Sequence, residues 1–161
     1  MESLQDSLET ISTGNDIYDV SNAHAKLGRF AAEGNQEAIS ALKKSIRENK
    51  QRSLHWGIQN GIAKAVTDSL PNLLIDAKDF VSHCDVIVLR NWGIFLRDAA
   101  NNKVQSHMAI LDIAFQIMKR YEIEVNEAKK IQTIHERHYD GLRELVIEVE
   151  ECLRGKEKAH R

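Results

Sequence analysis

The sequence predicts an all-α fold in which antiparallel helical hairpins stack into a short α-solenoid or an irregular bundle, followed by a long C-terminal helix. Apolar residues recur every three or four positions along most of the chain, which is the spacing that gives a helix one buried face. The 161 residues include a single proline and eight glycines, so few positions would interrupt a helix. Short polar stretches divide the apolar stripes into segments of ordinary helix length.

Residues 1–15 are expected to hold a short N-terminal helix, which Gly14 ends. Asn15 or Asp16 can cap a second helix that extends to Ala32, and Asn35 can cap a third. The side-chain oxygens of Asn and Asp accept the free backbone amides of a first helical turn. These residues therefore mark helix starts.

Residues 16–121 are predicted to form three helical hairpins. A helix from about residue 52 to residue 68 is followed by Pro71, which a first helical turn tolerates. Asp85 can cap the next helix, from residue 86 to about residue 100, and a further helix is expected from Lys103 onward. The short connections favour antiparallel neighbours.

The triplet Trp-Gly-Ile occurs twice, at Trp56 and at Trp92, and Leu27-Gly28 takes the same place in the first hairpin. The steps of 29 and 36 residues between these pairs are typical of stacked helix pairs. The interpretation is that each glycine lets two helices approach while the large side chain beside it covers the next pair. In this layout residues 16–121 resemble HEAT or armadillo-like α-solenoids. The resemblance implies a ridged surface that binds proteins or peptides.

Residues 122–154 are expected to form a long C-terminal helix, either in a coiled coil with a second chain or folded back onto the hairpins. A heptad frame from Ile110 to Leu153 has mostly apolar core positions, and a bend at residues 122–126 would divide this stretch into two helices. Residues 155–161 are expected to be a solvated tail. The predicted oligomer seam consists of Ile131, His135, His138, Leu142, Leu145 and Val149.

Composition narrows the class of protein. The net charge of −2 argues against a dedicated nucleic-acid packager. Cys84 and Cys152 are too few for a disulfide framework, so a reducing, cytoplasmic location is expected. No apolar run is long enough to cross a membrane. Because no phosphate-binding loop or nucleophile motif is present, neither a cofactor nor an enzymatic activity is expected.

Two histidine patterns raise metal binding as an alternative. His135 and His138 are three residues apart, which would put both imidazoles on one helical face, but further ligands are lacking and they are weak candidates. His107 and Asp112 resemble the His-x-x-x-x-Asp element of hemerythrin-like proteins. That resemblance implies a di-iron site, and His24, His55 and His83 lie on successive predicted helices. The carboxylate expected four residues after His55, however, is replaced by Gln59.

A basic cluster is a candidate site for phosphate or for an acidic partner. It consists of Lys43, Lys44, Arg47, Lys50 and Arg52. Its simpler explanation is a solvated helix end, where cations are favourable. The chain resembles HEPN-type ribonucleases in size and helix content, but their Arg…His motif does not fit, because nine residues separate Arg97 from His107.

The leading hypothesis is a non-enzymatic protein–protein interaction module, an adaptor or regulator, with a homodimer through the C-terminal helix as one arrangement. Two alternatives stay open. One is a helical nucleic-acid-binding protein or HEPN-like ribonuclease that uses residues 43–52. The other is a histidine-rich metal-binding helical protein.

Overall fold

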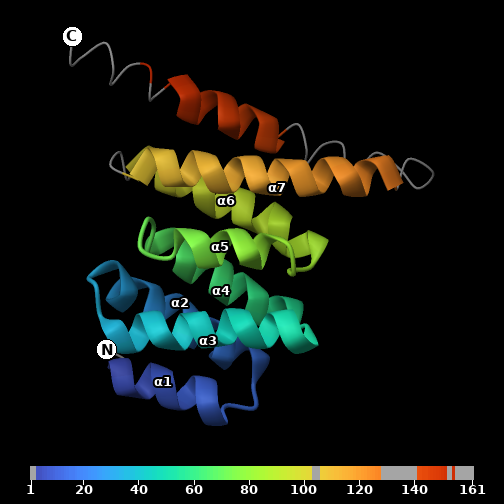
Figure 1. Ribbon diagram of the computed structural model, residues 1–161. Helices are drawn as coiled ribbons and strands as arrows, with labels where there is room; N and C mark the ends of the chain where they lie inside the picture. The colour runs from blue at the N-terminus through green and yellow to red at the C-terminus, as the bar shows by residue number, and fades with distance from the viewer. Residues whose placement is uncertain (1–2, 103–105, 128–140, 152–153, 155–161) are drawn as a thin grey trace.

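The structure is a computed structural model that describes residues 3–102, 106–127, 141–151 and 154. Within these ranges it contains helices and no strand, so the predicted all-α fold is confirmed. Residues 141–151 form a helix after the last labelled one (Figure 1). The labelled helices are α1 (Leu4–Thr13), α2 (Ile17–Ala32), α3 (Gln36–Arg52), α4 (Trp56–Asp68), α5 (Leu74–Val81), α6 (Val86–Asn102) and α7 (His107–Glu127).

The helices begin where capping side chains satisfy their first amides. The Asp16 carboxylate accepts hydrogen bonds from the backbone N–H groups of Tyr18, at 2.8 Å, and Asp19, at 3.2 Å. The Asn35 side chain does the same for Ala38, at 3.0 Å. Both predicted helix starts are therefore confirmed. Pro71 differs from the prediction, because it lies in a turn and α5 begins only at Leu74.

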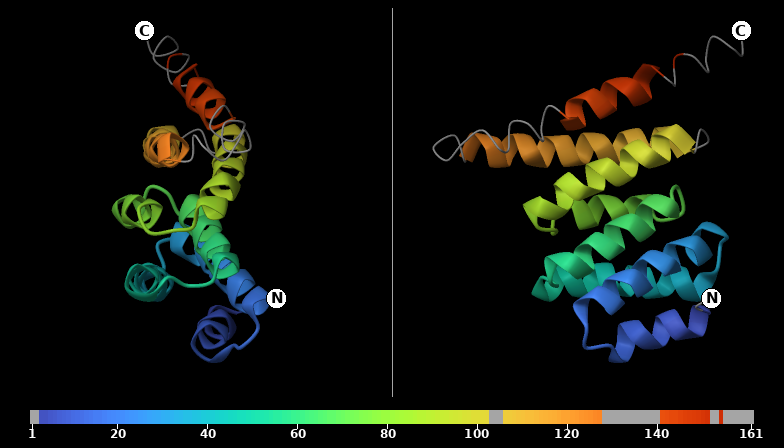
Figure 2. Two further views of the ribbon diagram at one scale, coloured as in Figure 1. Left: turned by 90° about the vertical axis from the view of Figure 1, so that its right-hand side faces the viewer. Right: turned by 180° about the vertical axis from the view of Figure 1, so that it is seen from behind.

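The helices form two layers (Figure 2). Helices α1, α3, α5 and α7 make one layer, and α2, α4, α6 and the 141–151 helix make the other. Consecutive helices alternate between the layers and run in opposite directions, so helices within a layer run in the same direction. Contacts link α2–α4–α6 and α3–α5–α7 along the layers, and α2–α3 and α6–α7 between them. The stacked hairpins follow from this alternation.

The closest packing lies between α2 and α4, and two glycines permit it. A Cβ atom on Gly61 would lie 2.2 Å from the backbone oxygen of Ser21, and one on Gly28 would lie 2.7 Å from Cα of Ala65. Both neighbours are backbone atoms, which cannot move aside as a flexible side chain can. The two helices therefore pack at a distance that any side chain at these positions would prevent.

The core is continuous through the stack and has Trp92 near its centre. The Trp92 side chain is fully buried, and its ring centroid lies 5.4 Å from that of Phe80 on α5. Its indole N–H donates a hydrogen bond of 2.9 Å to the Thr67 hydroxyl on α4. One apolar cluster extends from Leu27 on α2 to Val149 on the last helix.

The two Trp-Gly-Ile triplets do not occupy equivalent positions. Trp56 is the first residue of α4 and is 45% exposed, whereas Trp92 lies in the middle of α6 and is buried. The prediction that both rings cover a helix pair is therefore wrong for Trp56. Gly93 faces the flexible end of the Leu142 side chain, and the close backbone approach of α4 is made by Gly61 instead.

The C-terminal region also differs from the prediction in part. Helix α7 continues to Glu127, so it crosses the predicted boundary at residue 121 and has no break at residues 122–126. The 141–151 helix runs opposite to α7 (Figure 1), so the two cannot be one uninterrupted helix. Leu142, Leu145 and Val149 are buried in the core of the same chain and are not available for a seam between chains.

The remaining members of the predicted seam, Ile131, His135 and His138, lie outside the described residues, as does the tail at residues 155–161.

Candidate functional site

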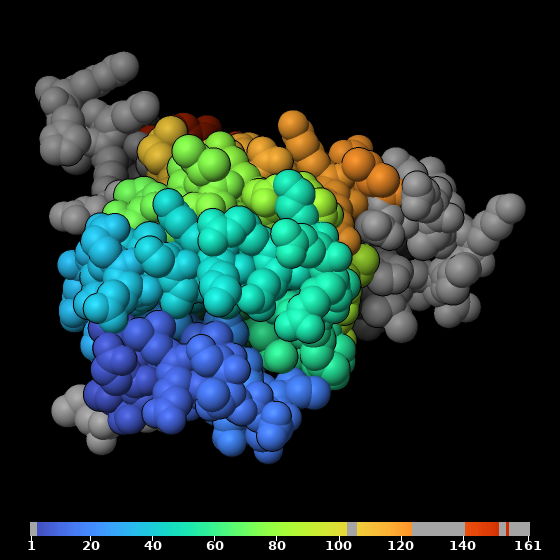
Figure 3. Space-filling model, turned by 60° about the horizontal axis from the view of Figure 1, so that its bottom comes forward, coloured from blue at the N-terminus to red at the C-terminus, as the bar shows by residue number. Residues whose placement is uncertain are grey.

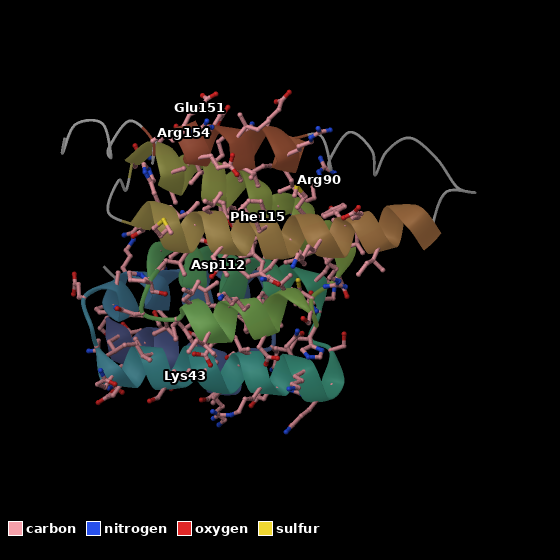
Figure 4. The ribbon with its side chains drawn as sticks, turned by 45° about the horizontal axis from the view of Figure 1, so that its top comes forward. Lys43, Arg90, Asp112, Phe115, Glu151 and Arg154 are labelled. Carbon is pink, nitrogen blue, oxygen red and sulfur yellow. The ribbon has the colours of Figure 1, made fainter. Side chains whose placement is uncertain are left out.

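The basic cluster of residues 43–52, which we call the α3 cluster, lies on the layer formed by α1, α3, α5 and α7. Most of its charge is paired. Figure 3 shows the exposed surface of α3 between the surfaces of α1 and α5. Ion pairs cross from α3 to α5 and from α5 to α7; Figure 4 labels Lys43 and Asp112, at the two ends of this series. The pairs are Lys43–Asp76 (4.0 Å), Lys50–Asp79 (3.6 Å) and Lys78–Asp112 (2.6 Å).

Only part of the α3 cluster is left for a ligand. Arg52 pairs with Glu48 one turn earlier on its own helix, at 3.9 Å. Lys44 and Arg47 are exposed and have no ion pair among the described residues. Three of the five cations therefore face carboxylates of the same chain. This pairing weakens the cluster as an anion site, since it lowers the local positive potential.

The histidines predicted as metal-ligand candidates do not converge where they are described. His107 is buried, and its Nε2 lies 2.8 Å from the Ala100 carbonyl oxygen, while Asp112 pairs with Lys78. His24 is buried between α2 and α3. No group of three metal-ligating side chains occurs within the described parts of the chain. His135 and His138 fall outside them.

Cys84 is not an activated nucleophile. Its thiol is buried, and burial raises its pKa to about 12, although the neighbouring Arg120 guanidinium acts in the opposite direction. Arg120 donates a hydrogen bond to the Val81 carbonyl oxygen and has a weaker contact with the sulfur. At neutral pH the thiol is therefore protonated and acts as a small core side chain.

A groove opens where the first turns of α2 and α4 meet, and we call it the α2–α4 groove. Its volume is about 650 Å³. Its two aromatic walls are exposed: the Tyr18 side chain is 73% and the Trp56 side chain 45% accessible to solvent. The lining residues are Asn15, Asp16, Ile17, Tyr18, Ser21, His55, Trp56, Gly57 and Asn60.

The parallel register of α2, α4 and α6 extends this surface across three helix starts. On one side, a Cβ on Gly57 would lie 3.0 Å from the Ile17 side chain. On the other side, the Asn91 amide donates to the Asn60 side chain at 3.1 Å. One turn before Asn91, α6 carries Ile87, which is exposed like Trp56 one turn before Asn60. An apolar strip therefore crosses the N-terminal ends of the three helices.

A buried polar network holds the start of α4 in place. The Gln59 amide donates to the Asn49 side chain, at 3.0 Å, and to the Leu54 carbonyl, at 2.8 Å, and its oxygen accepts from the Asp85 backbone, at 2.7 Å. Asn49 in turn donates to the His83 carbonyl oxygen. Because these side chains are fully buried and their amides are satisfied, the turn that presents Trp56 is rigid.

His55 is built into the same turn. Its Nδ1 accepts the Gly57 backbone N–H at 3.0 Å, which caps α4, and its ring lies 5.4 Å from that of Trp56. Asn60 uses its side-chain oxygen for Asn91, and among the described residues its amide N–H groups have no hydrogen-bond partner, so they are left for a ligand of the groove. The arrangement can therefore hold an apolar side chain against the two aromatic rings and hydrogen-bond a nearby peptide group.

The sequence pattern did not identify this groove. Tyr18 and Trp56 lie 38 residues apart on different helices, and their approach depends on the glycine-mediated packing of α2 on α4. One signal was present: Trp56 directly follows the cap of α4, Tyr18 is the second residue after the cap of α2, and both lie off the apolar stripes of their helices. A large aromatic residue in that position is expected to face solvent.

Comparison with known proteins gives no family. The chain matches no protein-family model, no curated protein and no solved structure. None of the helices in the described ranges has both the length and the apolarity needed to cross a membrane.

Proposed function

We propose that the chain is a non-enzymatic protein-interaction module, an adaptor or regulator of the cytoplasm, that binds a segment of a partner protein in the α2–α4 groove. The observation that carries this proposal is the exposure of Tyr18 and Trp56 on either side of a groove, while the aromatic rings of Phe80 and Trp92 are buried. Aromatic residues dominate protein interfaces because they bury a large area and lose little side-chain entropy.

The size and chemistry of the groove support a peptide segment as the ligand. A volume of about 650 Å³ is in the range of pockets that enclose several side chains. The groove is open, its exposed lining is mostly apolar, and polar groups of Asn15, Ser21 and Asn60 lie within it. The two groups most suited to acid–base chemistry, Asp16 and His55, cap α2 and α4, which favours binding over catalysis.

The alternatives have less support. Nucleic-acid binding through residues 43–52 would depend mainly on Lys44 and Arg47, because the other cations of the α3 cluster are paired. A metal site at His135 and His138 concerns residues outside the described ranges and stays a prediction. The likeness of the chain to HEAT or armadillo-like solenoids also stays a prediction, and so does a homodimer.

The test is a tagged pull-down from native lysate with three forms of the chain. The groove variant carries Tyr18→Ala and Trp56→Ala; the control carries Ile75→Ala and Met108→Ala, which remove two exposed apolar side chains from the opposite layer. We expect a stoichiometric protein that survives nuclease treatment, that the groove variant loses and that the control keeps, because only the groove variant removes the interface aromatics.

Two results would contradict the proposal. Equal recovery of the partner by both variants would show that the groove is not the binding surface. Recovery of nucleic acid that is released as salt is raised would instead favour the alternative based on Lys44 and Arg47.

A further inference from the structure

We infer that the segment held by the α2–α4 groove is cationic, with lysine or arginine side chains beside an apolar one. The inference rests on the proposed function and specifies its partner. A second hollow, of about 320 Å³, lies beside the groove, between α1 and α2. Its lining residues are Asp6, Glu9, Thr10, Thr13, Gly14 and Asp19.

The two hollows are lined by residues that are adjacent in the sequence. Gly14 in the second hollow is followed by Asn15 in the groove, and Asp19 follows Tyr18. An extended segment that lies on the aromatic walls of the groove can therefore continue over the corner between α1 and α2. Its side chains would meet an apolar surface first and a polar one next.

The charge of this corner has one sign. Four exposed carboxylates line the two hollows, and no lysine or arginine does. None of the four has an ion pair among the described residues, in contrast to the carboxylates of α5. The carboxylates are Asp6, Glu9, Asp16 and Asp19. A positively charged ligand would meet their combined potential without displacing a cation of the same chain.

The helix ends do not reverse this preference. The positive end of a helix dipole amounts to about half a unit charge and favours anions. Here Asp16 occupies the first amides of α2, and Asp6 takes part in the capping box of α1 with Ser3. Each carboxylate carries a full negative charge, and Glu9 lies beyond the first turn of α1. The net potential at this corner is therefore negative.

The aromatic walls favour the same ligand. The faces of Trp and Tyr rings attract ammonium and guanidinium groups, and a planar guanidinium also stacks on them. Trp56 and Tyr18 are exposed and next to the carboxylates, so a lysine or arginine side chain can contact both kinds of group. An anionic segment would gain the apolar contacts alone and would be repelled by the carboxylates.

The test measures binding of short fluorescein-labelled peptides to the full chain by fluorescence anisotropy. One peptide alternates lysine and arginine with leucine and phenylalanine; a second has glutamate for each cation, and a third has serine for each apolar residue. We expect the first to bind at least about ten-fold more tightly than either of the others, because only it matches both the charge and the aromatic walls. Raised salt should reduce the difference in affinity between the first peptide and the glutamate peptide.

Isosteric variants then separate charge from structure. Glu9→Gln, Asp16→Asn and Asp19→Asn together remove three charges, and asparagine at position 16 still caps α2. We expect binding of the cationic peptide to weaken about five-fold, as for the loss of several exposed ion pairs. Asp98→Asn, at the opposite end of α6, is the control and should change nothing.

Failure of this inference is distinguishable from failure of the proposed function. Equal affinity for the cationic and anionic peptides, or no binding of the cationic peptide up to about 1 mM, overturns the inference. If the partner from lysate is lost with Tyr18→Ala and Trp56→Ala but kept in full by the three-charge variant, the interaction module stands and its cationic partner does not.

Discussion

At the scale of single residues, the pair formed by His24 and Ser45 shows how burial fixes a protonation state. The Nδ1–H of His24 donates to the Val20 carbonyl oxygen at 2.8 Å, because a carbonyl can only accept. In the neutral ring Nε2 then accepts the Ser45 hydroxyl, which lies 2.7 Å away. Because the ring is buried, the neutral form is the favoured one. Burial accordingly lowers the pKa of His24 below its ordinary value of 6.5, against a smaller raising effect of the Val20 hydrogen bond and Glu48.

A pH dependence of stability follows. Since the pKa of His24 is lower in the folded chain than in the unfolded one, the unfolded chain takes up the proton first as the pH falls below 6.5. The contribution of the buried neutral His24 to the free energy of unfolding is complete above that pH and declines below it. The free energy then falls by at most about 1.4 kcal/mol per pH unit for one proton.

Denaturant unfolding between pH 7.5 and pH 5 measures this effect. The difference in free energy of unfolding between wild type and His24→Gln should narrow as the pH falls, because only the wild type carries the buried imidazole. His83→Gln, which changes a partly exposed histidine, is the control. An equal narrowing for both variants would show that His24 is not the source.

Residue-scale features were predictable where they are local. The caps at Asp16 and Asn35 follow from three or four neighbouring residues, and the sequence pattern found both. The exposure of Trp56 was not predictable in this way. Identical triplets around Trp56 and Trp92 meet different surroundings, since one starts a helix and the other lies in its middle.

At the scale of elements, the register between helices decides which side chains meet. The observed helix boundaries lie close to the predicted ones, because apolar stripes, caps and helix breaks are local patterns in the sequence. The register between helices was not predicted, because it depends on which glycine faces which backbone. Gly61 against Ser21 sets the packing of α2 on α4, and nothing in the sequence around Gly61 distinguishes it from Gly57. The ion pairs of the α3 cluster likewise depend on the register between α3 and α5, which the sequence pattern does not show.

A single methyl group tests this account of α2 and α4. Alanine has the higher helix propensity by about 1 kcal/mol, so Gly61→Ala would stabilise a solvent-exposed helix. Here the new Cβ would meet the Ser21 backbone at 2.2 Å. We expect a net destabilisation of about 1–3 kcal/mol, as in other overpacked cores.

Thermal and denaturant unfolding of the variant provide the measurement, with Gly141→Ala as the control, because a Cβ there meets nothing within 4 Å. The control should be neutral or slightly stabilising. If Gly61→Ala behaved like Gly141→Ala, the close approach of α2 and α4 would be refuted.

At the scale of the whole molecule, the stack leaves an apolar surface at its end that the last helix covers. Leu142 lies against Gly93 of α6, and Leu145, Val146 and Val149 join the common core. The sequence left open whether this stripe pairs within or between chains, since both arrangements need the same spacing of apolar residues. The burial of Leu145 and Val149 in the core of the same chain distinguishes them.

Leu145→Ala makes that distinction measurable. Leu145 is buried in the isolated chain, so its truncation should lower the free energy of unfolding by about 2–5 kcal/mol, the usual cost of removing a leucine side chain from a core. Ile147→Ala on the same helix removes a side chain that is 46% exposed and should cost no more than about 0.5 kcal/mol. Because the contacts of Leu145 are made within one chain, the unfolding midpoint of wild type and variant should not depend on protein concentration. A midpoint that rises with concentration, or a Leu145→Ala defect that disappears at high concentration, would instead mean that the stripe is covered by a second chain.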